Sequence, residues 1–407
     1  MRNLVCGLVL VTCFFSQSAT GQEGEGKGEV GLVLPLSGPY GPVGRQVREV
    51  AEFAARNAHL ELRVVDSKGT PKGALAAMVT LSKDPNVWTI IGPLGRHESL
   101  AAAGIAERLA ISLFVLNGAE SLNRVGDWIF RPRPSPEEQV EQLVVAIAKR
   151  GLTRIAILYP DNTYGQSSAR AFADRAQKRG VTITAISAYD EKTTQFDKPL
   201  QVLIGERARV GSNRLIAGKR ADGRGYLRVR KEGTVDFEAL FVPDMHGRVA
   251  RMLPFLSGVG IQDGRGGDGV AVQLLGLAGW QGASMELTGA LAAGAIYVDP
   301  FAPEATGGRA EEFHYRFLEE FGRSPVDLEA QVFDVVHFIG KSFESLGSNR
   351  RKDFSQTPRN FLRRSFLRQR SDGVCGTLSF GPKGEPVVEW GLYRFADDGT
   401  VTSAGDH

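Results

Sequence analysis

The sequence predicts an α/β protein built from two doubly wound parallel-sheet lobes that are joined by a multi-strand hinge. One strand–turn–helix unit spans residues 30–58, and an equivalent unit spans residues 154–180. Continuously apolar strands such as WTIIG at 88–92 are typical of parallel sheets, which are covered by helices on both faces. A chain of 407 residues is also too long for one core, so we expect two lobes.

The first lobe is predicted from a regular alternation of strands and helices. The opening unit has a strand at 30–36, the Gly/Pro turn SGPYGPVG and a helix at 45–58. We then expect strands at 60–66, 88–92 and 111–116 and helices at 73–82 and 98–109. This βαβαβαβ order with right-handed crossovers gives a doubly wound sheet.

The segment FRPRPSP at 130–136 interrupts the alternation with three prolines and suits a crossover into the second lobe. Beyond it we expect helices at 137–149, 165–179 and 247–257, and strands at 154–159, 181–189, 237–242, 272–276 and 295–298. Helices at 311–321 and 329–346 would complete the first lobe, and strands at 376–380 and 387–395 would close the fold as a pair. Lobe I is therefore expected at 30–133 and 301–347, and lobe II at 134–300 and 348–405.

The first residues predict export. One positive charge precedes a short apolar run at 4–15, and small residues at 18–21 suit a signal peptidase, so residues 1–21 are expected to be a signal peptide cleaved after Gly21. Residues 22–29 would then form a mobile leader. Lipidation at Cys13 is disfavoured because Thr12 is larger than the usual preceding residue and apolar residues continue past the cysteine. No later segment reaches the roughly 20 apolar residues that spanning a bilayer requires.

Composition argues against several classes of function. The formal net charge of +3 gives no general case for nucleic-acid binding. The sequence has no nucleophile elbow, no zinc-protease motif, no P-loop and no histidines at metal-ligand spacing, so we expect neither an enzyme nor a cofactor or metal site. Once the signal peptide has gone, Cys375 is alone, which excludes an intramolecular disulfide and suits a buried small side chain.

Residues 205–231 form a basic insertion. Nine cations face two acids there: Arg207, Arg209, Arg214, Lys219, Arg220, Arg224, Arg228, Arg230 and Lys231 against Glu206 and Asp222. A segment of this kind is either a solvated surface insertion or a contact for an acidic partner or an anionic envelope surface.

The order of motifs resembles the type I periplasmic solute-binding proteins, the leucine/isoleucine/valine-binding group of ABC importers. The motifs are VGLVLPLSGPYGPVG, a strand ending in IIGP, LYPDNTYG, DFEALFVPD and VQLLGLAGW. The phrase FDKPLQVLIG and the charged insertion are similar to those of a second group with the same fold, the penicillin-binding protein activators. The resemblance implies two lobes that close around a ligand.

The resemblance also implies a ligand site, which this chain matches only in part. Tyr164 matches the ligand-contacting tyrosine of the amino-acid binders. Arg96, followed by His97, stands where that family has a serine, and Asn117 and Gly118 replace its Ser/Thr/Ala cluster. Ala278 stands where an acidic residue would bind the ligand's ammonium, so a plain aliphatic amino acid is a doubtful ligand.

Several of these residues have two interpretations. Arg96 either forms an anion site with the N–H groups of a helix start or points into solvent. His97 could assist at low pH or be an ordinary surface residue. Asp244 could supply a negative charge or cap a helix. Tyr40 and Trp280 are expected to be apolar walls of the pocket or packing residues.

Two functions follow from the resemblance. The first is capture of a small solute, an amino acid or a related anion, for an ABC permease. The second is a regulatory scaffold that acts on a penicillin-binding protein. The partial loss of the amino-acid clamp and the basic insertion favour the second, whereas Tyr164 and the broad transport role of the superfamily favour the first.

Overall fold

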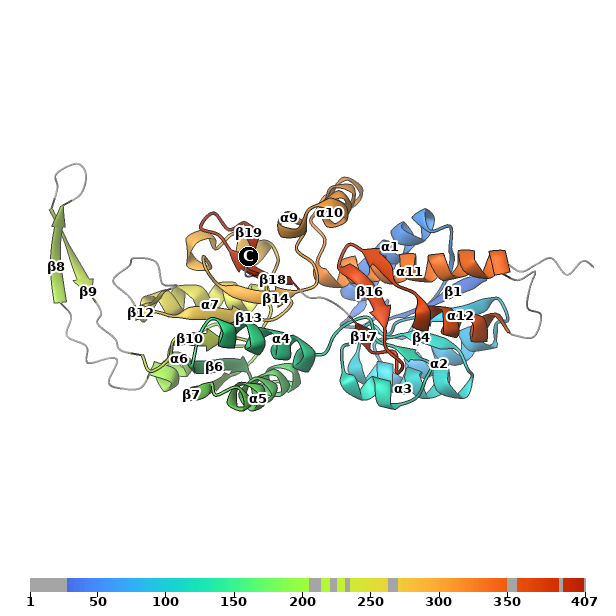
Figure 1. Ribbon diagram of the computed structural model, residues 1–407, viewed down its shortest axis with the longest axis horizontal. Coiled ribbons are helices and arrows are strands. Elements are labelled where there is room, and N and C mark those ends of the chain that lie inside the picture. The colour runs from blue at the N-terminus through green and yellow to red at the C-terminus, as the bar shows by residue number, and fades with distance from the viewer. Residues whose placement is uncertain are drawn as a thin grey trace, which may run out of the picture.

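Two lobes lie side by side in the computed structural model (Figure 1). The structure describes residues 28–204, 214–219, 225–230, 235–262, 270–349, 357–387 and 391–405. The predicted signal peptide, Cys13 and nearly all of the expected leader lie outside these residues. The α/β fold with two doubly wound parallel-sheet lobes is confirmed.

Lobe I is organised around a five-stranded parallel sheet of order β2-β1-β3-β4-β5. Its strands are β1 (Glu29–Leu34), β2 (Glu61–Asp66), β3 (Val87–Ile91), β4 (Ser112–Phe114) and β5 (Ile129–Phe130). Its helices are α1 (Gly41–Asn57), α2 (Pro71–Lys83), α3 (Arg96–Arg108), α10 (Gly308–Phe321), α11 (Asp327–Asn349) and α12 (Pro358–Arg368). A short helix, η1 (Glu120–Arg124), precedes β5.

Alternation along β1 supplies both faces of this sheet. Val30, Leu32 and Leu34 pack in the core beneath α1 and α11, whereas Val33 packs in the core beneath α2 and α3. Successive side chains of a strand point to opposite faces, and burial of both faces produces the continuous apolar runs seen in the sequence.

Lobe II is organised around a seven-stranded mixed sheet of order β19-β18-β14-β13-β10-β6-β7. Its strands are β6 (Arg154–Pro160), β7 (Thr182–Tyr189), β10 (Ala239–Phe241), β13 (Gln273–Gly276), β14 (Ile296–Asp299), β18 (Gly391–Phe395) and β19 (Val401–Ser403). Its helices are α4 (Pro136–Lys149), α5 (Thr163–Lys178), α6 (Asp197–Ile204), α7 (His246–Gly258), α8 (Ala283–Glu286), η3 (Gly289–Leu291) and α9 (Pro303–Thr306). The short strands β11 (Ile261–Gln262) and β12 (Val270–Ala271) pair with each other.

Helix starts in both lobes are fixed by side-chain caps. The Thr70 hydroxyl accepts a hydrogen bond from the Gly73 N–H at the start of α2. Ser135 and Glu138 form a reciprocal capping box at the start of α4, and Asn162 caps α5 through the Gly165 N–H. Each cap satisfies a donor that the helix itself leaves without a partner, typically worth about 1 kcal/mol.

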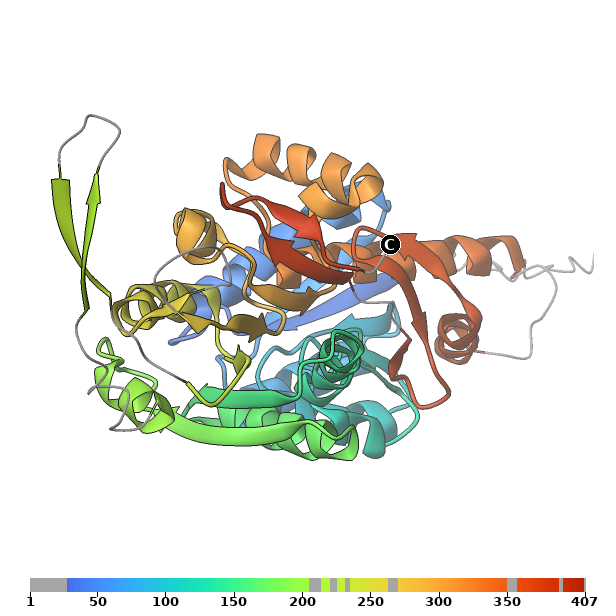
Figure 2. The ribbon, with the colours of Figure 1, turned by 60° about the vertical axis from the view of Figure 1, so that its left-hand side comes forward.

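The C-terminal part of the chain differs from the expected division. Residues 348–405 were assigned to lobe II, but α12 and the strands β15 (Ser371–Gly373), β16 (Gly376–Phe380) and β17 (Pro386–Val387) pack on lobe I. Phe366 and Phe380 lie against Phe114 and Phe130, with ring centroids 4.9–5.7 Å apart. Of the described strands in this part of the chain, only β18 and β19 join lobe II, so the predicted strands at 376–380 and 387–395 belong mainly to different lobes (Figure 2).

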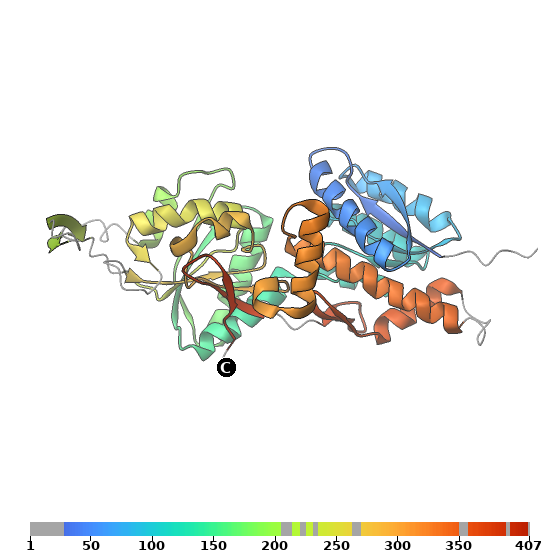
Figure 3. The same cartoon turned by 90° about the horizontal axis from the view of Figure 1, so that it is seen from above.

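The chain therefore passes between the lobes more than once. One passage follows β5 through the proline-rich segment, another follows β14, and a further one lies between β17 and β18. Figure 3 shows α10 and α11 on the lobe I side and the lobe II sheet on the other.

Of the predicted basic insertion, the structure describes the backbone of two strands. β8 (Arg214–Lys219) and β9 (Gly225–Arg230) pair antiparallel with each other as a separate two-stranded sheet. Figure 1 places this ribbon at the end of lobe II that is far from lobe I. The other residues of the insertion lie outside the described residues.

Candidate functional site

The loops that follow the carboxyl ends of the strands are the first place to look for a ligand in this architecture. In lobe I, Asp66 ends β2 and holds the loop after β1. Its carboxylate accepts hydrogen bonds from the Leu36 N–H at 2.8 Å, the Ser37 hydroxyl at 2.7 Å and the Lys68 N–H at 2.7 Å. Burial acts to raise the pKa of Asp66, but these hydrogen bonds outweigh it and lower the pKa. The first loop of lobe I is thereby fixed in place.

Helix α3 presents Arg96 and His97 in its first turn, and both side chains are exposed. The next residue, Glu98, is buried and binds inward: one oxygen accepts from the Ser67 hydroxyl at 2.5 Å and the other from the Gly95 N–H at 3.2 Å. Arg96 makes no ion pair within the described part of the chain. Lobe I thus offers an exposed positive charge over a rigidly capped helix start.

Asn117 and Gly118 hold the loop together. Asn117 donates to the Leu94 carbonyl at 3.2 Å and accepts from the Ala119 N–H at 3.0 Å. A Cβ on Gly118 would lie 2.5 Å from the Pro134 carbonyl oxygen, so glycine is required by the close approach of the crossover segment. Their hydrogen bonds and packing within the protein account for both residues.

The two proposed aromatic walls differ in exposure. Tyr40 is 63% exposed at the start of α1. Trp280 is fully buried in the lobe II core, where its indole N–H donates to the Val242 carbonyl at 3.0 Å. Trp280 therefore packs in the core of its own lobe, and of the two only Tyr40 offers an exposed apolar surface.

Tyr164 lies in the first turn of α5, and its ring packs partly buried against the lobe II core. The hydroxyl is buried and makes no hydrogen bond to any of the described residues. Burial, followed by the charges of Asp244 and Asp327, raises the pKa of Tyr164 well above its usual range. The hydroxyl therefore keeps its proton and is an unused donor, a situation that typically costs about 1–3 kcal/mol.

Asp244 is already paired inside lobe II. Its carboxylate, 2% exposed, accepts from Arg248 Nε at 2.6 Å and Nη2 at 2.9 Å, and from the Tyr189 hydroxyl at 2.6 Å. It also accepts from the Met245 N–H at 2.8 Å. Arg248, one helical turn later, pairs with this carboxylate, so Asp244 presents no unpaired negative charge in the structure.

An acidic hollow of about 370 Å³ at the carboxyl ends of β6 and β7 was not predicted. Asp161, Asp190 and Glu191 line it together with a single cation, Lys192. Asn162, the cap of α5, donates to Glu191 at 3.1 Å and so connects the hollow to the turn that carries Tyr164. The rule that sites gather at strand ends could have identified these carboxylates, since 160–161 and 190–191 directly follow the predicted strands at 154–159 and 181–189.

The crossover segments carry a second unpredicted set of charges. Arg133 donates to Asp327 at the start of α11 at 2.9 Å, while its Nη1 is buried and bonds to none of the described residues. Asp299, at the end of β14, is fully buried; burial, followed by the charge of Asp327, raises its pKa well above the usual range. These charges influence Tyr164 as well, so the crossovers and the start of α5 form one electrostatic environment.

The described residues contain neither a cluster of metal-ligating side chains nor a membrane-spanning helix. No group of three or more His, Cys, Asp or Glu side chains in that part of the chain has the arrangement of a metal site. None of the helices described there has the length and apolar character needed to cross a bilayer.

Comparison with known proteins agrees with this geometry. A family model described as periplasmic binding protein matches residues 28–216. The fold is that of a periplasmic binding protein. The resemblance drawn from the motifs is thereby confirmed, for both the solute-binding and the activator groups.

The curated relatives include penicillin-binding protein activators named LpoA. The protein from Aliivibrio fischeri is 26% identical over 240 residues, which is 56% of this chain and 37% of the relative. The one from Pasteurella multocida is 25% identical over 163 residues, 40% of this chain and 28% of the relative. The chain thus spans about a third of the length of the curated relatives it matches.

The solved structures that share the periplasmic binding fold cover almost the whole chain. A putative branched-chain amino acid ABC transporter protein from Rhodospirillum rubrum has a TM-score of 0.71 at 18% identity, covering 92% of this chain and 99% of that one. A leucine-binding protein from Thermotoga maritima has a TM-score of 0.65 at 15% identity, covering 93% and 98%. At these identities the likeness concerns the fold.

Proposed function

We propose that this protein captures a small solute between its lobes. The observation that carries the proposal is the buried Tyr164 hydroxyl, a protonated donor that bonds to no described residue. A buried donor without a partner destabilises the protein, and a ligand oxygen placed there would remove that cost. The matching tyrosine of the amino-acid binders supports the same role.

The charges around the strand ends favour a ligand that carries a carboxylate. Arg96 is an exposed cation on the lobe I side, and the Tyr164 hydroxyl is a donor on the lobe II side. Asp190 and Glu191 in the acidic hollow offer a partner for an ammonium group that Asp244 cannot supply. An amino acid or a related small anion fits this distribution of charge.

The fold suggests how the solute would be used. The solved neighbours are named as ABC transporter substrate-binding proteins, so we propose delivery to an ABC permease from an extracytoplasmic location. The predicted signal peptide and the match to a periplasmic family model support export to the periplasm.

A thermal-shift screen of the chain from Gln22 onward against amino acids, small carboxylates and muropeptides tests solute capture. A ligand that binds only the native state raises Tm by mass action. The hit should then lose its shift in Tyr164→Ala and Arg96→Ala variants that remain folded. An unchanged affinity in both variants would disprove the site.

The activator relatives favour a second candidate, a regulatory scaffold acting on a peptidoglycan synthase. Its specific support is the sequence similarity to penicillin-binding protein activators together with the β8–β9 ribbon, which lies at the far end of lobe II and pairs with no other strand among the described residues. Pull-down of a penicillin-binding protein by the wild type, compared with a variant in which 205–234 is replaced by a short Gly/Ser linker, would test it. Capture that depends on the insertion would support this candidate; no capture by either protein would argue against it.

A further inference from the structure

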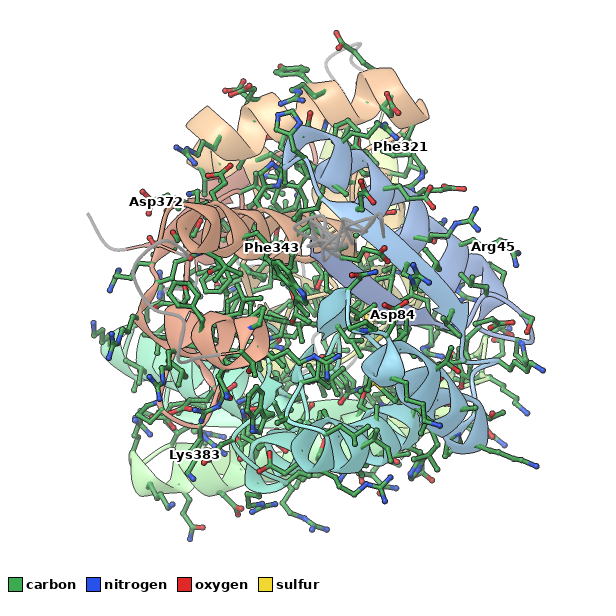
Figure 4. The ribbon with its side chains drawn as sticks, turned by 90° about the vertical axis from the view of Figure 1, so that its right-hand side faces the viewer. Arg45, Asp84, Phe321, Phe343, Asp372 and Lys383 are labelled. Carbon is green, nitrogen blue, oxygen red and sulfur yellow. The ribbon has the colours of Figure 1, made fainter. Side chains whose placement is uncertain are left out.

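A hollow of about 280 Å³ lies on lobe I, away from the strand-end loops. Helices α10 and α11 form two of its sides, and the β15 strand with the turn after it forms the third. Figure 4 shows α10 above α11, with Asp372 beside both helices. Its volume is just below the ~300–1,000 Å³ typical of ligand pockets, which suits a small ligand. None of its lining residues belongs to the site around Tyr164.

Three cations line this hollow: Arg309 and Arg316 from α10 and Lys341 from α11. Arg309 donates to the Asp372 backbone carbonyl at 2.9 Å, and Lys341 donates to the Ser371 hydroxyl at 2.9 Å. In the described part of the chain, neither Arg309 nor Lys341 forms an ion pair with a carboxylate. The Arg316 guanidinium lies 4.0 Å from the Glu312 carboxylate. All three side chains are exposed and retain donors.

Of the three carboxylates that line the hollow, Asp334 and Asp372 are hydrogen-bonded to other partners. Asp334 is buried and accepts from the N–H groups of Val374 at 2.7 Å and Cys375 at 2.8 Å. The Asp372 carboxylate accepts from the Thr377 hydroxyl at 2.9 Å. Glu312 is exposed. Among the described residues, Arg309 and Lys341 are therefore bonded to neutral acceptors, whereas Arg316 has the exposed Glu312 beside it.

His337 lies among these cations. Its Nδ1 lies 3.0 Å from the Phe333 carbonyl oxygen. Since a carbonyl oxygen can only accept a hydrogen bond, Nδ1 must carry the proton, and Nε2 is unprotonated when the ring is neutral. Burial, followed by the charges of Lys341, Arg316 and Arg309, lowers the pKa of His337, an effect that the carbonyl hydrogen bond only partly offsets. The three charges therefore act on one point, and an anion bound there would oppose their effect.

The floor of the hollow is apolar. Phe313 and Phe333 both line it, with ring centroids 4.5 Å apart, and both are almost fully buried. A ring of cations over an apolar floor suits a ligand with a charged head and an apolar body.

We propose that this hollow is a second ligand site, which binds a small organic carboxylate through its three cations and places the apolar part against the two phenyl rings. The site shares no residue with the proposed interlobe site, so the two proposals can be tested independently.

Nuclear magnetic resonance titration of the His337 ring in the full-length mature protein tests this, with phenylacetate as the probe and neutral phenylacetamide as its matched control. His337→Gln identifies the resonance. Phenylacetate should shift it saturably and raise the His337 pKa, whereas phenylacetamide should not.

The double variant Arg309→Gln/Lys341→Gln should bind phenylacetate about tenfold or more weakly. The control pair Lys72→Gln with Arg364→Gln changes two exposed cations elsewhere on lobe I and should leave binding unchanged.

The Tyr164→Ala variant separates the two sites. Phenylacetate binding that survives in Tyr164→Ala but weakens in the double Gln variant supports the hollow. Binding lost in Tyr164→Ala and retained in the double Gln variant would overturn the second site and favour the interlobe one. Absence of any saturable shift, or equal shifts from both probes, would also overturn it. A peptide ending in a phenylalanine carboxylate distinguishes the source: tighter binding than phenylacetate assigns the carboxylate to a polypeptide end, and weaker binding assigns it to a free molecule.

Discussion

Two buried polar groups of this molecule, one in the first crossover and one at the start of α5, differ in whether their hydrogen bonds are satisfied. Arg131, 1% exposed in the first crossover, directs its donors to Glu138, Asn123 and two backbone carbonyls. The Tyr164 hydroxyl, at the start of α5, is buried and bonds to none of the described residues. The satisfied Arg131 specifies structure, whereas the unsatisfied hydroxyl of Tyr164 is the basis of the proposed solute site.

The largest expected effect tests the satisfied region. Arg131→Leu should lower the free energy of unfolding by about 3–5 kcal/mol, because it leaves Glu138 without its buried partner. Urea denaturation measures the loss. The double variant Arg131→Leu/Glu138→Gln should cost less than the single one, since no charge is then left unpaired. A loss under about 1 kcal/mol would contradict this, because it would match the contribution of an ordinary exposed ion pair.

Asp334 is an intermediate case, bonded by two N–H groups yet deeply buried. Burial raises its pKa to about 6, although those hydrogen bonds act to lower it. The folded state thus holds this proton more tightly than the unfolded chain. Stability from Asp334 is fully present below about pH 4 and is lost as the pH rises through about 6, by roughly 3 kcal/mol. The difference in stability between wild type and Asp334→Asn should shift in that window; a constant difference would contradict the raised pKa.

The smallest effect is expected at the surface. Arg56 and Glu320 form an ion pair at 2.5 Å, but their side chains are 60% and 44% exposed. Glu320→Gln should therefore change the free energy of unfolding by no more than about 1 kcal/mol, and less in high salt. Thermal unfolding at low and high salt measures this, and a loss comparable to that of Arg131→Leu would undo the distinction between buried and exposed pairs.

Much of the fold could be predicted from the sequence, because strands that are buried on both faces of a sheet appear as continuous apolar runs. The strand at 154–160 and the helix at 163–178 follow the predicted unit closely. It did not predict α12, whose sequence PRNFLRRSFLR is mostly polar and buries only Leu362 and Phe366 deeply. That helix depends on tertiary packing against Phe114 and Phe130.

The site was predictable only in part, for a physical reason. The motif identified Tyr164, but not that its hydroxyl lacks a partner, which depends on packing. Arg133 lies in the proline-rich segment that predicted a crossover, and nothing in that segment indicated a role for its charge. Asp244 and Arg248 are four residues apart, but Asp244 precedes the predicted helix at 247–257, so the helical pattern alone did not predict their pairing. Partners distant in sequence, such as Asp327 for Arg133, depend on the tertiary fold.

The most direct test of the interlobe site is the affinity of Tyr164→Phe for the solute that gives the largest thermal shift, measured by isothermal titration calorimetry beside the wild type. The phenyl ring keeps the packing and removes only the unused hydroxyl. We expect an affinity about tenfold or more weaker and a free energy of unfolding that is unchanged or up to about 2 kcal/mol higher. An unchanged affinity, or a marked loss of stability without ligand, would show that the hydroxyl serves the structure and that the solute does not bind it.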